Sequence, residues 1–233
     1  MDKSLVYKTI GMILATVLPV VLFLYFRTNN GFKQNNMLPH AWWPISIDSI
    51  EENGKWKYDT VFHKIPHFKY ITSEGKFVTD SDMIGKVSVV NFFFAQCPSI
   101  CPIMNSNMAN VIQSVSASNN LRIFSFTIDP DRDSLPALAE YSNKYNTGKV
   151  TWHFLRGQQD STFQLGRNGF KIPVDNTDSE TDFLHSDRMI LVDAKKQIRG
   201  YYLGTDSVDM SRLKNDIVLM LDDLENPKKR RRR

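Results

Sequence analysis

The chain has 233 residues, a formal net charge of +4 and a sequence pI near 9.0. Its 42% hydrophobic content, with 15 phenylalanines, is enough to fill a core and excludes a disordered or low-complexity chain. Two cysteines are too few for a disulfide scaffold. The basic excess belongs to the ends, because residues 34–227 hold 19 Lys and Arg against 24 Asp and Glu, a net charge of −5. An acidic body argues against a nucleic-acid partner.

The amino-terminal region predicts a membrane anchor. Residues 9–26 (TIGMILATVLPVVLFLYF) carry no charge and, as a helix, would span about 27 Å, close to the hydrocarbon thickness of a bilayer. A cleaved signal peptide is the alternative, but bulky Leu24, Tyr25 and Phe26 stand where small residues should precede a cleavage site. We therefore expect a cytoplasmic stub at 1–8 and a single transmembrane helix at 9–26. This fits a bacterial inner-membrane protein whose domain lies on the periplasmic side.

The polar residues 27–46 read as a tether, in which Trp42 and Trp43 lie either at the membrane interface or against the domain. A domain at 47–226 follows, and the run KKRRRR ends a basic tail at 227–233. That tail is interpreted as an appended extension, with contact to lipid head groups as the alternative.

Hydrophobic periodicity within the domain predicts alternating strands and helices. Thr60–Thr72 and Phe77–Thr79 resemble a hairpin with Gly75 at its turn, and Val87–Phe94 reads as a strand buried on both faces. The further predicted strands are Leu121–Ile128, Val150–Leu155, Arg188–Val192 and Gln197–Leu203. The predicted helices are Met104–Val115 (beginning near Pro98), Leu135–Tyr145 (capped by Ser134, with Pro136 in its first turn), Ser161–Asn168 and Val208–Leu224. This order predicts an α/β sandwich with a mixed central sheet.

The two cysteines, Cys97 and Cys101, flank a proline-containing turn directly after the buried strand. If the helix begins near Pro98, they lie one turn apart on one face, with Cβ atoms about 5–6 Å apart. Two thiolates at a helix start suit a soft metal ion or reversible oxidation, because free backbone N–H groups stabilise negative charge there. Spacing alone also allows two buried, unreactive cysteines.

The runs FFFAQCPSICPIM, TIDPDRDS and FLHSDRMILVD resemble the SCO/SenC family of cytochrome c oxidase assembly proteins over most of residues 60–225. The resemblance implies a thioredoxin-like fold after an amino-terminal anchor. It also implies a copper site formed by Cys97, Cys101 and His185, and delivery of copper to the dinuclear centre of oxidase subunit II. Two thiolates and one imidazole suit copper, since soft sulfur favours Cu(I).

Two functions remain open. One is a copper metallochaperone that receives the ion from a copper donor protein. The other is a thiol–disulfide reductase that uses Cys97 and Cys101 to keep the oxidase's copper-site cysteines reduced. His185 separates them, because a reductase needs only the two thiols.

Other candidate residues have simpler interpretations. His63 and His67 are predicted to be surface residues, and His153 is predicted to be structural. Met104 and Met108 follow the spacing of a core-facing helix stripe rather than of copper ligands. His40 is assigned to the tether and Asp175–Asp187 to an acidic surface loop. The motif Asp129–Asp133 is typical of the family by the same resemblance: its carboxylates either orient the copper site or form a partner surface, or they make a turn that leads into a helix, and Asp129 and Asp133 are not assigned as metal ligands.

Overall fold

The computed structural model describes residues 16–19, 44–52, 55–172, 175–176, 183–184 and 187–226. Met1–Met37, together with Arg233, forms one compact unit and Leu38–Arg232 forms the other. The second unit contains all the strands and helices named below. Within the described residues, no helix has both the length and the apolar character needed to cross a membrane. Most of the predicted anchor at 9–26, like the stub at 1–8 and the tail at 227–233, lies outside the described residues.

The second unit is built on a seven-stranded sheet of order β11-β10-β5-β6-β7-β3-β4. β5, β6 and β7 are parallel, and every other neighbouring pair in the sheet is antiparallel. The strands are β3 (Lys69–Thr72), β4 (Phe77–Thr79), β5 (Val87–Phe93), β6 (Leu121–Thr127), β7 (Thr151–Arg156), β10 (Arg188–Val192) and β11 (Ile198–Leu203). The mixed α/β sheet predicted from the sequence is confirmed.

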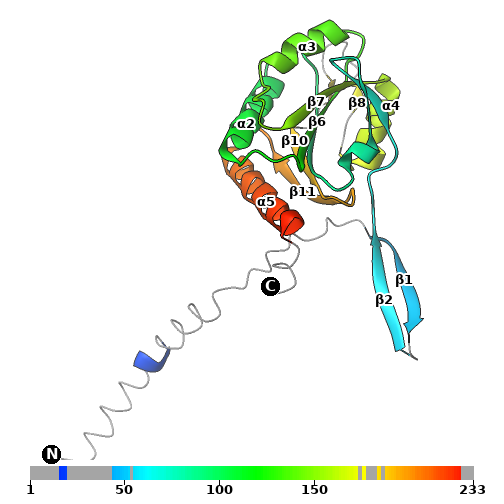
Figure 1. Cartoon of the computed structure of the whole chain (residues 1–233), viewed down its shortest axis with the longest axis vertical. Helices are drawn as coiled ribbons and strands as arrows, with labels where there is room; N and C mark the ends of the chain where they lie inside the picture. Colours follow the sequence, from blue (N-terminus) through cyan, green and yellow to red (C-terminus); the bar gives the residue numbers. More distant parts are fainter. Residues whose placement is uncertain are drawn as a thin grey trace, which may run out of the picture. The chain divides into compact units, whose positions relative to one another are not determined.

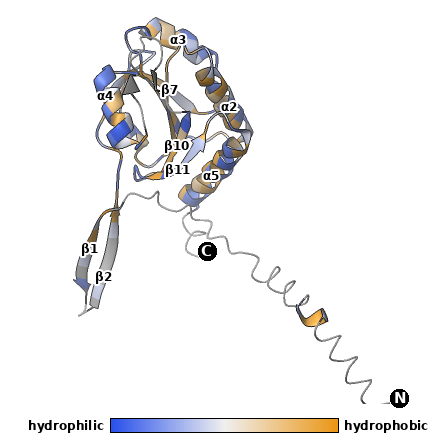
Figure 2. Ribbon diagram, turned by 180° about the vertical axis from the view of Figure 1, so that it is seen from behind, coloured by the Kyte–Doolittle hydropathy of each residue, from blue (hydrophilic) through white to orange (hydrophobic). Residues whose placement is uncertain are grey.

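Helices cover both faces of this sheet. They are α2 (Ile100–Ser114), α3 (Leu135–Asn143), α4 (Gln159–Gln164) and α5 (Ser207–Glu225). α2 and α5 lie on one side of the sheet and α4 on the other (Figure 1). Hydrophilic and hydrophobic residues alternate along α2 and α5, as expected for helices with one buried face (Figure 2).

The core is dense in phenylalanine, as the composition predicts. All seven residues of β5 are buried, which explains its nearly unbroken apolar sequence. Phe92 stacks on Phe126 with ring centroids 5.4 Å apart, and Phe68 meets Phe126 edge-on at the same separation. Aromatic pairs in these geometries add to the free energy gained from burial alone. Met104 and Met108 are fully buried, so their assignment to the core is confirmed.

Several boundaries differ from the sequence-based prediction. The predicted strand Thr60–Thr72 is two strands, because β2 (Lys55–Phe62) ends before β3 begins, and Pro66 between them lacks the N–H that a sheet ladder requires. The β3–β4 hairpin itself is confirmed, with Gly75 at φ +79° in its turn. The predicted helix Ser161–Asn168 is α4 followed by a π-helical turn, Leu165–Gly169.

Two further sheets of two strands each are not paired with the main sheet. β1 (Pro44–Glu52) pairs with β2, a hairpin that the sequence analysis missed, and β1 begins inside the predicted tether. β8 (Asp175–Asn176) pairs with β9 (Phe183–Leu184) inside the predicted acidic loop.

Candidate metal and redox site

The cysteine turn lies at the carboxyl end of the buried strand β5. Cys101 is the second residue of α2, whereas Cys97 precedes the helix, which begins at Ile100 rather than near Pro98. Pro98 disfavours helical backbone angles at Cys97, and Ser99, at φ −127°, is the N-cap that precedes the first helical residue. The two sulfur-bearing residues still meet, because the Cys101 N–H donates to the Cys97 Sγ at 3.5 Å. This N–H is one of those that a helix start leaves without a partner.

The two thiols have different surroundings. Cys101 is fully buried and Cys97 is 5% exposed, and neither is in a disulfide. Hydrogen bonding with the Cys97 sulfur, followed by burial, raises the pKa of the Cys101 thiol far above its usual range. Cys101 is therefore a protonated thiol in the metal-free protein. A metal ion that coordinates it must displace that proton, because a coordinating thiol binds as thiolate.

A buried aspartate holds the cysteine turn against the next loop. The Asp133 carboxylate accepts hydrogen bonds from the Ala95 N–H, at 3.0 and 3.2 Å, and from the Thr127 hydroxyl. Burial raises the pKa of Asp133 despite these bonds. Asp129 in the same loop forms an ion pair with Arg132. The loop at 129–133 is therefore more than a helix-leading turn, because Asp133 connects it to the backbone two residues before Cys97.

A chain of buried polar side chains runs beneath the turn, and the sequence analysis missed it. Trp152 donates to Ser125, Ser125 donates to Asn91, Asn91 donates to Asn105, and Asn105 donates to Tyr141, at 2.6–3.1 Å. The sequence carried two signals of this network: an asparagine inside the apolar run of β5, and another inside the apolar stripe of α2. Satisfied buried networks of this kind fix the relative position of packed elements.

Asn105 follows Cys101 by one helical turn, so the network connects the cysteine-bearing end of α2 to β5, β6, β7 and α3. Burial is the main cause of a strongly raised pKa for the Tyr141 phenol, with the nearby Tyr145 and Cys101 adding to it. Tyr141 is therefore an uncharged member of the network.

His185, the third predicted ligand, lies outside the described residues. Two residues later, the Asp187 carbonyl accepts a hydrogen bond from Gly204 at 2.7 Å. A Cβ on Gly204 would lie 2.8 Å from Cγ of Met104, in the first turns of α2, so the backbone here approaches α2 closely. Among the described residues, no three His, Cys, Asp or Glu side chains group together as metal ligands.

The other described histidines lie elsewhere. His67 pairs with Asp80 at 2.7 Å and its side chain is 78% exposed, as predicted for a surface residue. His63 is partly buried, with Nε2 2.8 Å from the Gly169 carbonyl oxygen, so its assignment to the surface is only partly correct. His153 packs on the Phe124 ring, and burial lowers its pKa, in agreement with a structural role.

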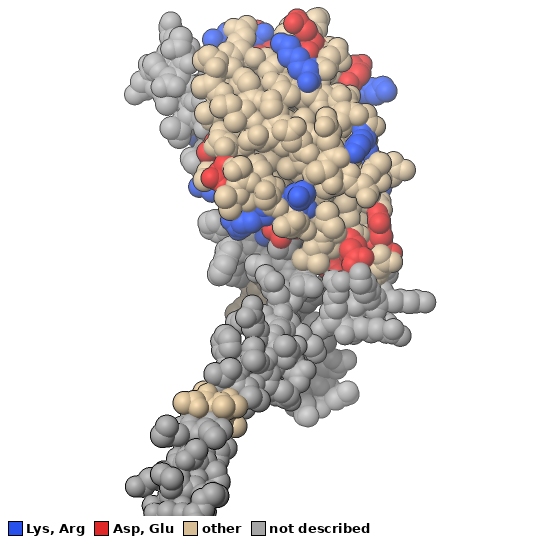
Figure 3. Space-filling view, turned by 90° about the vertical axis from the view of Figure 1, so that its left-hand side faces the viewer, with Lys and Arg blue, Asp and Glu red and all other residues tan. Residues whose placement is uncertain are grey.

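The surface around α2 is poor in charge. No charged residue occurs between Lys86 and Arg122, a stretch that contains β5, the cysteine turn and the whole of α2. The face of the molecule that carries α2 and α5 is uncharged over its centre, with acidic and basic side chains gathered at its rim (Figure 3). Ile103, next to the buried first turn of α2, is 49% exposed. Depletion of charge is typical of the central part of a protein–protein interface.

The α/β domain carries two thiols, neither of them in a disulfide, at the junction of a buried strand and its following helix, an arrangement that is chemically suited to metal binding or redox exchange. Residues 58–220 match the sequence model of the SCO1/SenC family. The chain belongs to the SCO1/SenC family.

Relatives and solved structures agree with this assignment. The SCO1 protein homolog of Bacillus subtilis is 26% identical over 166 residues, which cover 70% of this chain and 86% of the relative. The human mitochondrial SCO1 homolog is 30% identical over 103 residues, but the match spans only 33% of its length and 43% of this chain. In the Arabidopsis thaliana mitochondrial homolog 1 the match spans 43%.

A SCO1/SenC lipoprotein from Bacillus anthracis superposes with a TM-score of 0.62 at 23% identity, covering 68% of this chain and 95% of that structure. BsSco, described as a cytochrome c oxidase assembly protein with a disulfide switch, superposes with a TM-score of 0.60 at 25% identity over 68% of this chain and 93% of that one. Yeast Sco1 with copper bound gives 0.58 at 23% identity, covering 73% and 95%. These similarities confirm the thioredoxin-like fold.

Proposed function

We propose that this protein is a copper metallochaperone that binds one copper ion through Cys97, Cys101 and His185. The observation that carries the proposal is the shared turn of the two thiols, in which the N–H of Cys101 contacts the Cys97 sulfur at 3.5 Å. The Cys101 thiol also hydrogen-bonds with the Cys97 sulfur, so the two thiols can act on one soft ion, and soft sulfur favours Cu(I). Structural relatives with copper bound support the same assignment.

The third ligand rests on family resemblance and on chain position. His185 stands two residues before Asp187, whose carbonyl oxygen is held by Gly204, and Gly204 itself packs against α2. This close approach to the cysteine-bearing helix supports His185 as the imidazole ligand. Zinc is a weaker candidate, because structural zinc sites normally use four protein ligands and the chain has no third cysteine.

The proposed acceptor is cytochrome c oxidase, with delivery to the dinuclear copper site of subunit II, and the proposed source is a copper donor protein. We further propose that residues 9–26 anchor the protein in a bacterial inner membrane and that the domain lies outside the cytoplasm. Alkaline carbonate extraction of cell membranes tests the anchor: an integral protein stays in the membrane pellet, and release into the supernatant contradicts it.

Copper titration of the full chain in a neutral detergent tests the three-ligand site. Wild-type protein should bind about one Cu(I) per chain in competition with a chromogenic chelator, and His185→Ala should weaken binding by at least about tenfold, because one ligand is lost. His67→Gln is the matched control, since this exposed histidine lies on another part of the domain. Unchanged affinity in His185→Ala would remove His185 from the site.

A second function has a specific observation in its favour. Neither Cys97 nor Cys101 forms a disulfide and the two are hydrogen-bonded to each other, so they can reduce a partner disulfide and become a disulfide themselves, with two electrons and two protons transferred. This reaction does not require His185. The His185→Ala protein tests this role with a disulfide-bonded copper-site domain of oxidase subunit II as substrate. If that variant does not bind copper but reduces the disulfide as fast as wild type, the reductase role is independent of copper.

A further inference from the structure

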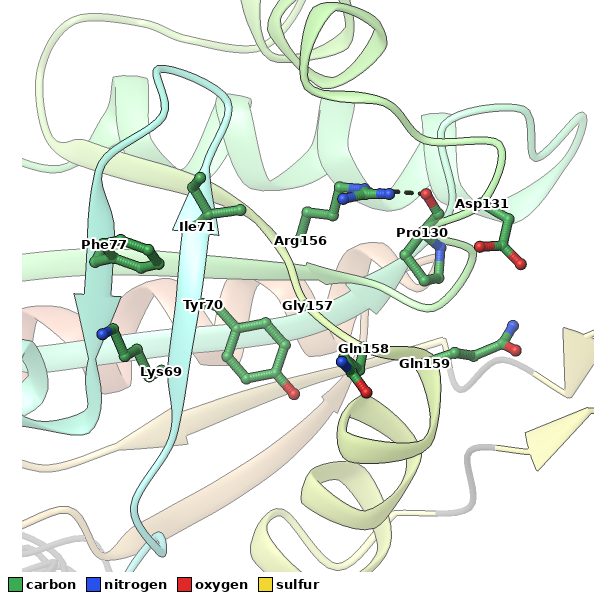
Figure 4. Close-up of a pocket in the computed structure, with 10 residues that line it drawn as sticks. All are labelled: Lys69, Tyr70, Ile71, Phe77, Pro130, Asp131, Arg156, Gly157, Gln158 and Gln159. Carbon is green, nitrogen blue, oxygen red and sulfur yellow. Dashed lines mark hydrogen bonds between the residues drawn. The ribbon is translucent and has the colours of Figure 1, made fainter.

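A groove of about 580 Å³ lies between β3 and β7, where the two strands separate. β7 ends at Arg156 and pairs with β3 only through Thr72 and Ile71, although β3 continues to Lys69 and pairs with β4 through Lys69, Tyr70 and Ile71. The Tyr70 ring packs against Gly157, the residue after β7, where a Cβ would lie 2.3 Å from that ring. The groove is lined by Lys69, Tyr70, Ile71, Phe77, Pro130, Asp131, Arg156, Gly157, Gln158 and Gln159 (Figure 4).

One buried polar group in the groove has no partner. The Tyr70 side chain is almost fully buried, yet its hydroxyl forms no hydrogen bond of ordinary geometry with the rest of the described chain. The Thr162 hydroxyl is near enough to act on the phenol, but its own hydrogen bond goes to the Gln158 carbonyl oxygen at 3.1 Å. The Tyr70 hydroxyl points toward Gln158 (Figure 4). A buried hydroxyl without a partner costs free energy, which a ligand with an acceptor would recover.

Two cations border the same groove. Arg156 donates from Nε to the Pro130 carbonyl oxygen at 3.0 Å, which fixes the plane of the guanidinium. Its terminal nitrogens form neither an ion pair nor a hydrogen bond within the described residues. Lys69 stands over the exposed Phe77 ring at 4.3 Å. A guanidinium fixed through Nε presents its remaining N–H groups as a fork that fits a carboxylate.

The ligand that fits must carry more than an anion. Asp131 lies at the far end of the groove from Lys69 and, in the described part of the chain, has no ion pair of its own (Figure 4). An isolated small anion would meet this carboxylate as a repulsive charge. An extended peptide can place an acidic side chain beside Arg156 and a basic side chain beside Asp131. Its backbone can also use the part of β3 that β7 leaves unpaired.

We propose that this groove binds an extended peptide segment of a partner protein, with an acidic side chain held by Arg156 and a second acceptor of the peptide taking the hydrogen bond of the Tyr70 hydroxyl, while Lys69 borders the opposite end. The groove contains neither cysteine, so the proposal goes beyond copper binding and does not depend on it. One end of the groove, at Pro130 and Asp131, belongs to the loop whose Asp133 accepts a hydrogen bond from Ala95, two residues before Cys97.

Fluorescence anisotropy tests the proposal with the full chain in a neutral detergent. The probe is a fluorescein-labelled, end-blocked peptide, Val-Thr-Glu-Val-Lys, and its control has Gln in place of Glu. We expect saturable binding of the Glu peptide, at least about fivefold weaker binding of the Gln peptide, and weakening as salt rises from about 0.05 M to about 0.5 M.

Variants locate the binding. Arg156→Gln should weaken peptide binding at least about tenfold. Arg156→Lys should weaken it less, because the charge stays while the forked arrangement of N–H donors is lost. Tyr70→Phe should weaken it severalfold without any change in charge. Lys76→Gln, in the exposed turn of the β3–β4 hairpin, is the matched control and should bind like wild type. Far-ultraviolet circular dichroism and an unchanged urea midpoint show that the variants are folded.

Three results would overturn the proposal: no saturable binding, equal affinity for the Glu and Gln peptides, or Arg156→Gln and Tyr70→Phe proteins that bind like wild type. Competition with succinate separates a peptide site from a small-acid site. If succinate displaces the probe at concentrations as low as those at which unlabelled peptide does, the peptide proposal would also be refuted. A failure of copper binding leaves these readouts unaffected, so the two proposals fail separately.

Discussion

The buried link between Asn91 and Asn105 offers a quantitative test of how the cysteine-bearing helix is held. Asn91 donates to the Asn105 Oδ1 at 3.1 Å and accepts from Ser125 at 2.6 Å, and all three residues are buried. Asn91→Leu leaves the Ser125 O–H without an acceptor and the Asn105 oxygen without a donor, while the Ser125 oxygen still accepts from Trp152. Asn105→Leu leaves the Asn91 amide N–H without its acceptor and removes the Asn105 donor to the Tyr141 oxygen.

Each buried polar group left without a partner costs about 1–3 kcal/mol, and the added apolar surface of leucine returns part of this. Each single variant should therefore lower the free energy of unfolding by about 2–4 kcal/mol. The double variant removes both members of the central bond and leaves only the Ser125 and Tyr141 groups without partners. Its cost should be smaller than the sum of the single costs by about 2 kcal/mol.

Urea unfolding of the full chain, followed by tryptophan fluorescence and by circular dichroism, measures all four members of the cycle. The slope of the free energy against urea must stay constant for the comparison to hold. Additive costs, with no coupling between the two positions, would refute the inferred network. A stabilised single variant would do so as well, because it would mean that the asparagine's partners are satisfied in another way.

Three further predictions concern the site and the groove. Gly157→Ala should destabilise the domain by about 1–3 kcal/mol in urea, because the new Cβ would lie 2.3 Å from the Tyr70 ring; an unchanged midpoint would show that the ring moves freely. Asp133→Asn should alter the pH dependence of stability. Because the pKa of Asp133 is raised in the folded state, protonated Asp133 contributes to the free energy of unfolding, fully below about pH 3.8. That contribution is lost as the pH rises through the folded-state pKa, so the stability of wild type should fall relative to that of the variant between these two pH values. Iodoacetamide should modify native Cys101 far more slowly than Cys97, since Cys101 is fully buried and protonated; mass spectrometry that finds equal labelling would contradict this.

Much of the fold follows from local sequence pattern. The apolar run of β5 predicted a strand buried on both faces, and Ser134 and Pro136 predicted the start of α3, where the Ser134 hydroxyl accepts from the Ala137 N–H. The β1–β2 hairpin was not predicted, although apolar and polar residues alternate in Ile45–Asp48 and in Trp56–Asp59. The helix after Cys97 begins later than predicted, at Ile100, because Ser99 at φ −127° is its N-cap.

The sequence by itself determined the dithiol turn, the order of the helices and of the strands of the main sheet, and the family, because these depend on residues close together in the chain. Only the tertiary structure showed that Asp133 holds the backbone beside Cys97, that a polar chain from Trp152 to Tyr141 fixes α2, and that β3 and β7 separate around Tyr70. Each of these contacts joins residues far apart in the chain, so they exist only when the sheet brings its strands together. The sequence shows that residues 34–227 are acidic overall, but only the structure shows how that charge is distributed: the face that carries α2 is uncharged at its centre.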